Sequence, residues 1–163
     1  MKQLEINPKE DLFFDLKVRE MCKSCKRFGK KATCPPHIES VEYYSKLLPQ
    51  YEHGIVYYEK FYVGSGKYWI EKGKKSSLEI YEKVICERNK LIAVHGHYFF
   101  IAFGAGSCKL CDECSFPCKN PQKSLIPFEA TGIDIVKIMG KQGVSIEFPI
   151  ETTFYRIGAI FYD

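Results

Sequence analysis

The sequence predicts a mixed α/β fold, with one small mixed sheet flanked by helices and a cysteine-rich loop region. Three observations lead to this prediction. Strand-like apolar runs alternate with helical patterns along the chain. The length of 163 residues suits one domain and is short for two. Seven of the eight cysteines fall into two groups that interrupt this alternation. We therefore expect a single domain over residues 1–163.

The first half of the chain predicts a helix, a strand and a second helix. Apolar residues recur at helical spacing over 41–48 and stop at Pro49, as in a short amphipathic helix. Residues 54–63 are rich in β-branched and aromatic side chains, which indicates a mostly buried strand. An S-x-x-E capping box at Ser76 then predicts a helix that runs to about Asn89.

The second half predicts a buried strand, a helix and a terminal pair of strands. Residues 98–103 are apolar on both faces and lead into a glycine turn before the second cysteine group. After the cysteines, Pro127 suits the first turn of a helix that stops at Gly140 or Gly143. The segments 144–150 and 154–162 resemble strands, and we expect them to pair in an antiparallel hairpin.

Composition and charge limit the partners and the cellular compartment that we expect for the protein. The net charge of +4 is mild, and the lysines are scattered among glutamates, so we expect no nucleic-acid partner. The cluster at 71–77 fits a solvated loop and helix start. The beginning of the chain has no secretory pattern, and the apolar run 91–106 is interrupted by histidines and glycines, so we expect no membrane span. We predict a cytoplasmic protein whose cysteines serve metal binding rather than disulfides.

The second cysteine group has the spacing C-x2-C-x2-C-x3-C. This spacing is that of bacterial iron–sulfur sequences, because two-residue gaps let thiolates curve around one small inorganic core. We favour a [4Fe–4S] cluster. Zinc remains the alternative, because C-x2-C pairs also build zinc sites. The ligands predicted here are Cys108, Cys111, Cys114 and Cys118.

The first group consists of Cys22, Cys25 and Cys34, the last of which precedes two prolines that stiffen the backbone. In two-cluster ferredoxins the fourth cysteine of the sequence binds the other cluster, and by this logic Cys118 would join the first group. Seven sulfurs do not divide into two sets of four. We therefore expect one or two clusters, with a non-cysteine corner, spare thiols or Cys86 making up the difference.

The remaining candidates are weaker. Cys86 lies beside the apolar face of a predicted helix, and we interpret it as a buried structural thiol. His37 is close enough in sequence to serve as a ligand, but an exposed loop histidine is the simpler interpretation. We expect His95 and His97 to face solvent. The sequence contains no recognisable nucleophile, acid and base set, so any catalysis would have to come from the metal centre itself.

The sequence resembles a family of predicted metal-binding proteins, the domain of unknown function 2284. The resemblance is carried by "CKSC…CPP" over 22–36, "GAGSCKLCDEC" over 104–114, "PC" at 117–118 and "EATGID" over 129–134. It implies metal binding through these cysteines and an anaerobic setting, and it implies no known reaction.

The sequence thus predicts a cysteine-ligated metal-binding protein, an iron–sulfur protein with an electron-transfer or redox role. A zinc-stabilised interaction module without redox activity is the alternative. A reversible thiol switch at Cys22 and Cys25 is a third, weaker interpretation. A redox partner protein is the partner we expect, and the sequence leaves both enzymatic activity and oligomeric state open.

Overall fold

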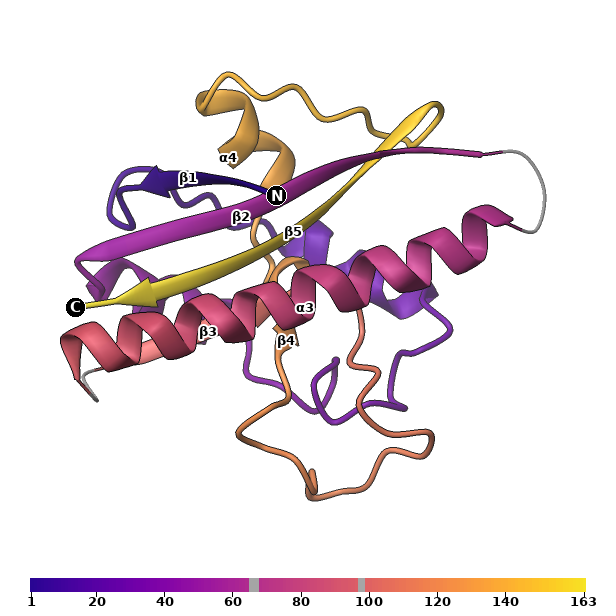
Figure 1. Ribbon diagram of the computed structural model, residues 1–163, viewed down its shortest axis with the longest axis horizontal. Helices are drawn as coiled ribbons and strands as arrows, with labels where there is room; N and C mark the ends of the chain where they lie inside the picture. Colours follow the sequence, from indigo (N-terminus) through magenta and orange to yellow (C-terminus); the bar gives the residue numbers. More distant parts are fainter. Residues whose placement is uncertain (65–67, 97–98) are drawn as a thin grey trace.

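A computed structural model of the chain describes residues 1–64, 68–96 and 99–163 and confirms the mixed α/β class (Figure 1). The strands are β1 (Lys2–Ile6), β2 (His53–Tyr62), β3 (Phe100–Gly104), β4 (Ile126–Pro127) and β5 (Thr153–Tyr162). The α-helices are α1 (Leu16–Glu20), α2 (Val41–Leu47), α3 (Tyr68–His95) and α4 (Ile135–Lys141). Three 3₁₀ turns complete the described elements: η1 (Met21–Ser24), η2 (Leu48–Gln50) and η3 (Phe128–Thr131).

The sheet has the strand order β1-β2-β5-β3-β4, with only the β3–β4 pair parallel. β2 and β5 pair antiparallel over their whole length, from His53 opposite Tyr162 to Tyr62 opposite Thr153. The strand predicted over 144–150 is wrong, because this segment forms no strand in the structure. Its expected partner β5 is already paired on both sides, so no free edge remains for a hairpin.

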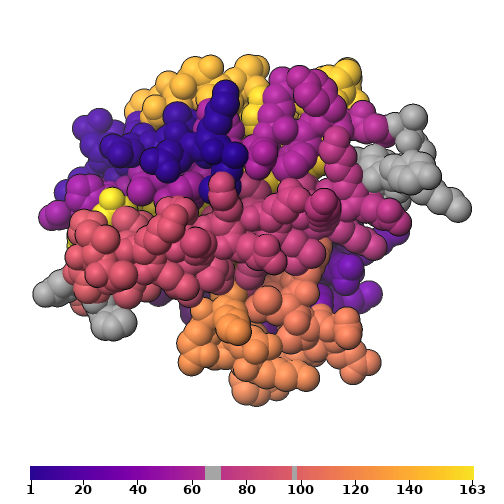
Figure 2. All heavy atoms as spheres, in the orientation of Figure 1, coloured from indigo at the N-terminus to yellow at the C-terminus, as the bar shows by residue number. Residues whose placement is uncertain are grey.

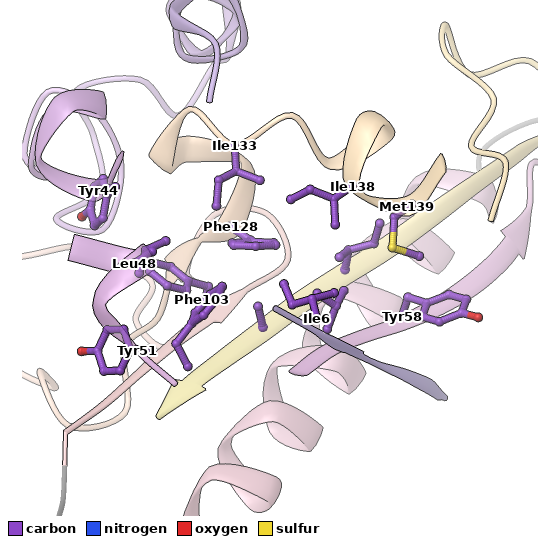
Figure 3. Packing of buried hydrophobic residues seen from close by; sticks show 14 residues of the cluster. Ile6, Tyr44, Leu48, Tyr51, Tyr58, Phe103, Phe128, Ile133, Ile138 and Met139 are labelled. Carbon is purple, nitrogen blue, oxygen red and sulfur yellow. The ribbon is translucent and has the colours of Figure 1, made fainter. Parts of the chain in front are cut away.

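Two apolar cores lie on opposite faces of the sheet, as the alternation of side chains along a strand requires. Ile55 and Tyr57 of β2 face α3, whereas Val56 and Tyr58 face the other side. That second, larger core is covered by α2, η3 and α4, and Figure 3 shows their side chains converging on the strands. Gly158 lets α3 approach β5, because a Cβ there would lie 2.7 Å from the Val84 side chain.

α3 is longer than its sequence pattern indicates, and the capping box predicted at Ser76 is wrong. The helix begins at Tyr68, so Ser76 lies inside it and is buried. Its hydroxyl donates to the Gly73 carbonyl (3.1 Å) and accepts from Arg156 Nε (3.2 Å). The charged cluster 71–77 is therefore part of a helix rather than a loop. No helix in the described residues is long and apolar enough to cross a membrane.

The helix predicted from Pro127 to the glycines is divided. Ile126 and Pro127 form the short strand β4, and η3 follows directly. Gly132 then takes a positive φ of 88°, where a Cβ would lie 2.6 Å from Val41. Only the second part, from Ile135, is an α-helix. The predicted strand over 98–103 is observed from Phe100 onward, and Tyr98 lies outside the described residues.

Candidate metal centre

Two cysteine-bearing segments lie side by side beyond one edge of the sheet (Figure 1). We call residues 20–40 the N-terminal cysteine segment and residues 105–125 the cysteine loop, which protrudes below α3 in Figure 2. The Ala32 N–H donates to Cys114 Sγ (3.2 Å), and Lys31 Nζ donates to the Cys111 carbonyl (3.4 Å). The rings of His37 and Phe116 are in contact, with centroids 4.3 Å apart and the ring planes tilted by 49°. The fold therefore joins the two groups into one region.

α3 holds both ends of the cysteine loop. Ser77 Oγ donates to the Ala105 carbonyl (2.6 Å) where the loop leaves β3. At the other end, the Tyr81 hydroxyl donates to the Lys123 carbonyl, and Arg88 Nη1 donates to the Gln122 carbonyl (3.1 Å). Burial raises the pKa of Tyr81, and the nearby Cys108 thiol adds to this shift. These bonds fix the position of the cysteines without using any side chain of the cysteines themselves.

All four cysteines of the loop line one small cavity with a volume of about 10 Å³, which we call the four-cysteine cavity. Asn120 contacts two of the sulfurs: its side-chain Nδ2 donates to Cys111 Sγ (3.2 Å), and its backbone N–H donates to Cys118 Sγ (3.4 Å). Such bonds orient and tune metal-bound thiolates. The structure thus places Cys118 with the other cysteines of its own loop, and not with the N-terminal group as the ferredoxin logic suggested.

Polar groups from the N-terminal cysteine segment close this cavity. Lys31 lines it with only 7% of its surface exposed, and none of the ion pairs in the described part of the chain involves it. Its hydrogen bond to the Cys111 carbonyl brings no negative charge, and lysine is almost never this buried without a charged partner. Thr33 also lines the cavity, and its buried hydroxyl makes no hydrogen bond of normal geometry among the described residues. A buried cation and an unpaired hydroxyl beside four thiols fit an anionic, thiolate-bound metal centre.

The three remaining candidate ligands, Cys22, Cys25 and Cys34, line a second cavity with a volume of about 120 Å³, the three-cysteine cavity. Burial raises the pKa of Cys34 to about 12, and burial together with the Glu129 carboxylate raises the pKa of Cys22. Without metal both groups are therefore thiols at neutral pH. A metal would have to displace their protons, so binding would be pH-dependent.

The local backbone positions these three sulfurs. Cys22 lies in η1 directly after α1, where Arg19 donates to the Ala130 carbonyl (2.5 Å) and to the Glu39 carbonyl (3.1 Å). This arginine ties the cysteine-bearing turn to η3. The backbone N–H of Cys34 donates to the Lys31 carbonyl (3.0 Å), and this bond closes the turn that carries Cys34. The two cavities adjoin, since Thr33 lines one and the next residue, Cys34, lines the other.

Glu129 is a site residue that the sequence analysis did not identify as a candidate. It lines the three-cysteine cavity, and its Oε1 accepts from the Gly106 N–H (3.2 Å). Gly106 has a φ of 72°, and a Cβ there would lie 3.1 Å from Ser77 Oγ, so glycine suits this turn. Burial raises the pKa of Glu129, opposed in part by the charge of Arg156. Its carboxylate supplies an oxygen donor beside three sulfurs.

The other candidate residues lie away from both cavities. Cys86 is exposed on α3, so the interpretation as a buried thiol is wrong: the residue lies on the solvent side of the helix. His37 is exposed, as expected, with its Nε2 3.1 Å from the Gly29 carbonyl oxygen. His95 is exposed at the end of α3, and His97 lies outside the described residues. All eight cysteines are free thiols in the structure.

The arrangement defines a class of protein: a mixed α/β scaffold that presents seven thiols in two adjoining cavities, suited to metal binding. The chain belongs to the family described as predicted metal-binding protein (DUF2284), whose model matches residues 5–162. This confirms the resemblance seen in the cysteine motifs. Neither the search of curated proteins nor the search of solved structures returned a match.

Proposed function

We propose that this protein is an iron–sulfur protein with an electron-transfer or redox role. In this proposal Cys108, Cys111, Cys114 and Cys118 hold one [4Fe–4S] cluster. A second cluster lies at Cys22, Cys25 and Cys34. The observation that carries the proposal is the convergence of seven thiols on two adjoining cavities, with Lys31, which has no anionic partner among the described residues, buried beside the first. Thiolates are soft ligands and favour iron–sulfur clusters or zinc.

The residues around the four-cysteine cavity are suited to a redox centre. A cluster bound there would supply one-electron transfer. The N–H groups of Ala32 and Asn120 donate to the sulfurs and would stabilise their negative charge. The Lys31 ammonium would do so more strongly, which favours the reduced state. The exposed loop around the cavity would give a redox partner protein access to this end of the molecule.

The three-cysteine cavity offers one ligand position that no cysteine fills. Glu129 lines the same cavity, and its carboxylate is a candidate for this position. A carboxylate binds iron less tightly than a thiolate does, so this position would exchange more readily. The proposal places the protein in a reducing, anaerobic cytoplasm, where cysteines are not oxidised to disulfides and the clusters would survive.

A structural zinc site is the second candidate for the four-cysteine cavity. The volume of about 10 Å³ is close to that of one water-sized sphere, which suits a single ion better than a cluster. Against this, no group of three or more His, Cys, Asp or Glu side chains over residues 1–64, 68–96 and 99–163 is arranged to hold one ion. To bind one zinc ion, the four sulfurs would have to come to about 3.8 Å from one another, because each Zn–S bond in a tetrahedral site is about 2.3 Å long.

Counting iron, zinc and acid-labile sulfide in anaerobically purified protein tests the proposal. We expect iron and sulfide in equal amounts, with a broad absorbance near 400 nm. Cys118→Ser and Cys34→Ser should each lower the iron content, whereas the exposed Cys86→Ser serves as the matched control and should not. Stoichiometric zinc without sulfide would refute the iron–sulfur proposal and support the structural zinc site.

A further inference from the structure

A third cavity adjoins the three-cysteine cavity on the other side of Glu129. Its volume is about 150 Å³, the size of an engineered protein cavity that binds benzene. It lies between α4, the start of β5 and the irregular segment 146–150. Most of its lining is apolar, including Ile135, Ile146, Phe148 and Phe154. Gly106 and Glu129 line both this cavity and the three-cysteine cavity, so they form the wall between the two.

Arg156 places a positive charge in this apolar cavity. Its Nε donates to Ser76 Oγ (3.2 Å), its Nη2 donates to the Gly73 carbonyl (3.0 Å), and its guanidinium lies 5.1 Å from the Phe154 ring centroid. These bonds use two of the five N–H groups of an arginine. No carboxylate within the described ranges lies within 4 Å of it. Burial lowers the pKa of Arg156, and the charge of Glu129 opposes this shift.

Among the described residues, two acidic side chains line the cavity, Glu129 and Glu147, and neither forms an ion pair with Arg156. Glu147 accepts hydrogen bonds from the backbone N–H groups of Thr152 (2.9 Å) and Thr153 (2.8 Å) and from both hydroxyls. Glu129 accepts from the Gly106 N–H. The guanidinium therefore retains N–H donors that no carboxylate of residues 1–64, 68–96 or 99–163 accepts. The planar fork of an arginine matches the two oxygens of a carboxylate.

We propose that this cavity binds a small organic carboxylate, with its carboxylate at Arg156 and its apolar body against Ile135, Ile146 and Phe154. The bound molecule lies next to Glu129, the residue that separates it from the three-cysteine cavity. Binding itself needs only the cavity and Arg156. Its role as a substrate of the neighbouring centre rests on the proposed metal function.

Binding of benzoate, followed by chemical shifts in ¹H–¹⁵N NMR spectra, tests this proposal. We expect benzoate to shift resonances of β5 and α4 with saturation, and the neutral benzamide to bind at least tenfold more weakly. Benzylamine should not bind. No saturable shift with benzoate, or tighter binding of benzylamine, would overturn the proposal. Iron and sulfide are counted in the same samples, so failure of the metal proposal is seen separately.

Variants locate the site. Arg156→Gln should weaken benzoate binding at least tenfold. Because Arg156 also bonds to α3, Val136→Trp provides a second test: Val136 lies exposed at the cavity on α4, and the larger ring should fill it. The matched control is Val94→Trp on α3, where the valine is exposed and away from the cavity. Benzoate binding that is unchanged in folded Val136→Trp protein would overturn the location.

Discussion

Removing the charge of Lys31 tests whether the four-cysteine cavity holds an anionic centre. Lys31 is 7% exposed, and its Nζ is 3.4 Å from the Cys111 carbonyl oxygen. At an effective dielectric constant of about 20, a unit charge about 6 Å from a thiolate contributes roughly 3 kcal/mol. Lys31→Met keeps the length of the side chain and removes this contribution. Without metal, the same change removes a buried unpaired charge and should leave the unfolding free energy equal or higher.

We therefore expect opposite outcomes in the two states of the protein. The affinity for metal, measured by chelator competition under anaerobic conditions, should fall about 30- to 150-fold, corresponding to about 2–3 kcal/mol. The unfolding free energy of the metal-free protein, measured by guanidinium denaturation, should not fall. Lys30→Met is the matched control, because Lys30 is the adjacent exposed lysine. Equal effects of the two variants on metal affinity, or a loss of 2–3 kcal/mol in the metal-free protein alone, would refute the reasoning.

Three further predictions concern packing, loop anchoring and pH. Gly158→Ala should lower the unfolding free energy by about 1–3 kcal/mol in urea denaturation, because its Cβ would overlap the Val84 side chain. Tyr81→Phe should cost about 1 kcal/mol by the same measurement, since the Lys123 carbonyl loses its donor, and proteolysis within the cysteine loop should become faster. Hydrogen bonds to backbone N–H groups lower the pKa of Glu147 to about 2, so the stability advantage over Glu147→Gln should be constant above about pH 5 and vanish as the pH falls toward 2.

Each of these predictions has a matched control. Gly140→Ala adds a methyl group where nothing lies within 4 Å and should not destabilise the protein. Tyr43→Phe alters an exposed tyrosine and should leave the loop as resistant to protease as before. Glu151→Gln changes an exposed acid close in sequence and provides the reference curve for the Glu147 comparison. A control variant that matches its test variant would contradict the corresponding argument.

The sequence predicted the elements whose pattern reflects burial alone. β2 and β5 carry apolar side chains on both faces, and α2 repeats them at helical spacing, so each was predicted within a few residues. β1 was not predicted, because its sequence KQLEI is short, partly charged and at the sheet edge. The start of α3 was misplaced for a different reason. Gly73 and the lysines around it look like a loop, and the sequence does not show the close contact with Arg156, whose Nη2 would lie 3.3 Å from a Cβ at this position.

The sequence predicted which cysteines form each group, but it did not predict which residues surround the sulfurs. Spacing in the chain shows which cysteines can act together, and the structure places both groups on cavities. The spacing does not show that Lys31, one lysine among many, is buried. It also does not show that Glu129 lies beside Cys22 and Cys34. Both depend on how distant segments meet. The only sequence signal for Glu129 was its place at the start of the EATGID motif.

The separation of the two sulfur sets along the chain has a consequence for biosynthesis. The cysteines of each set lie within one segment of the chain, so they leave the ribosome together. The N-terminal set emerges first, yet Gly106, Pro127 and Glu129, which close its cavity, are synthesised much later. During that interval Cys22, Cys25 and Cys34 are open to oxidants and to competing metal ions. In the proposed two-cluster protein, loading of this cavity would therefore depend on delivery late in synthesis or on protection of the nascent chain.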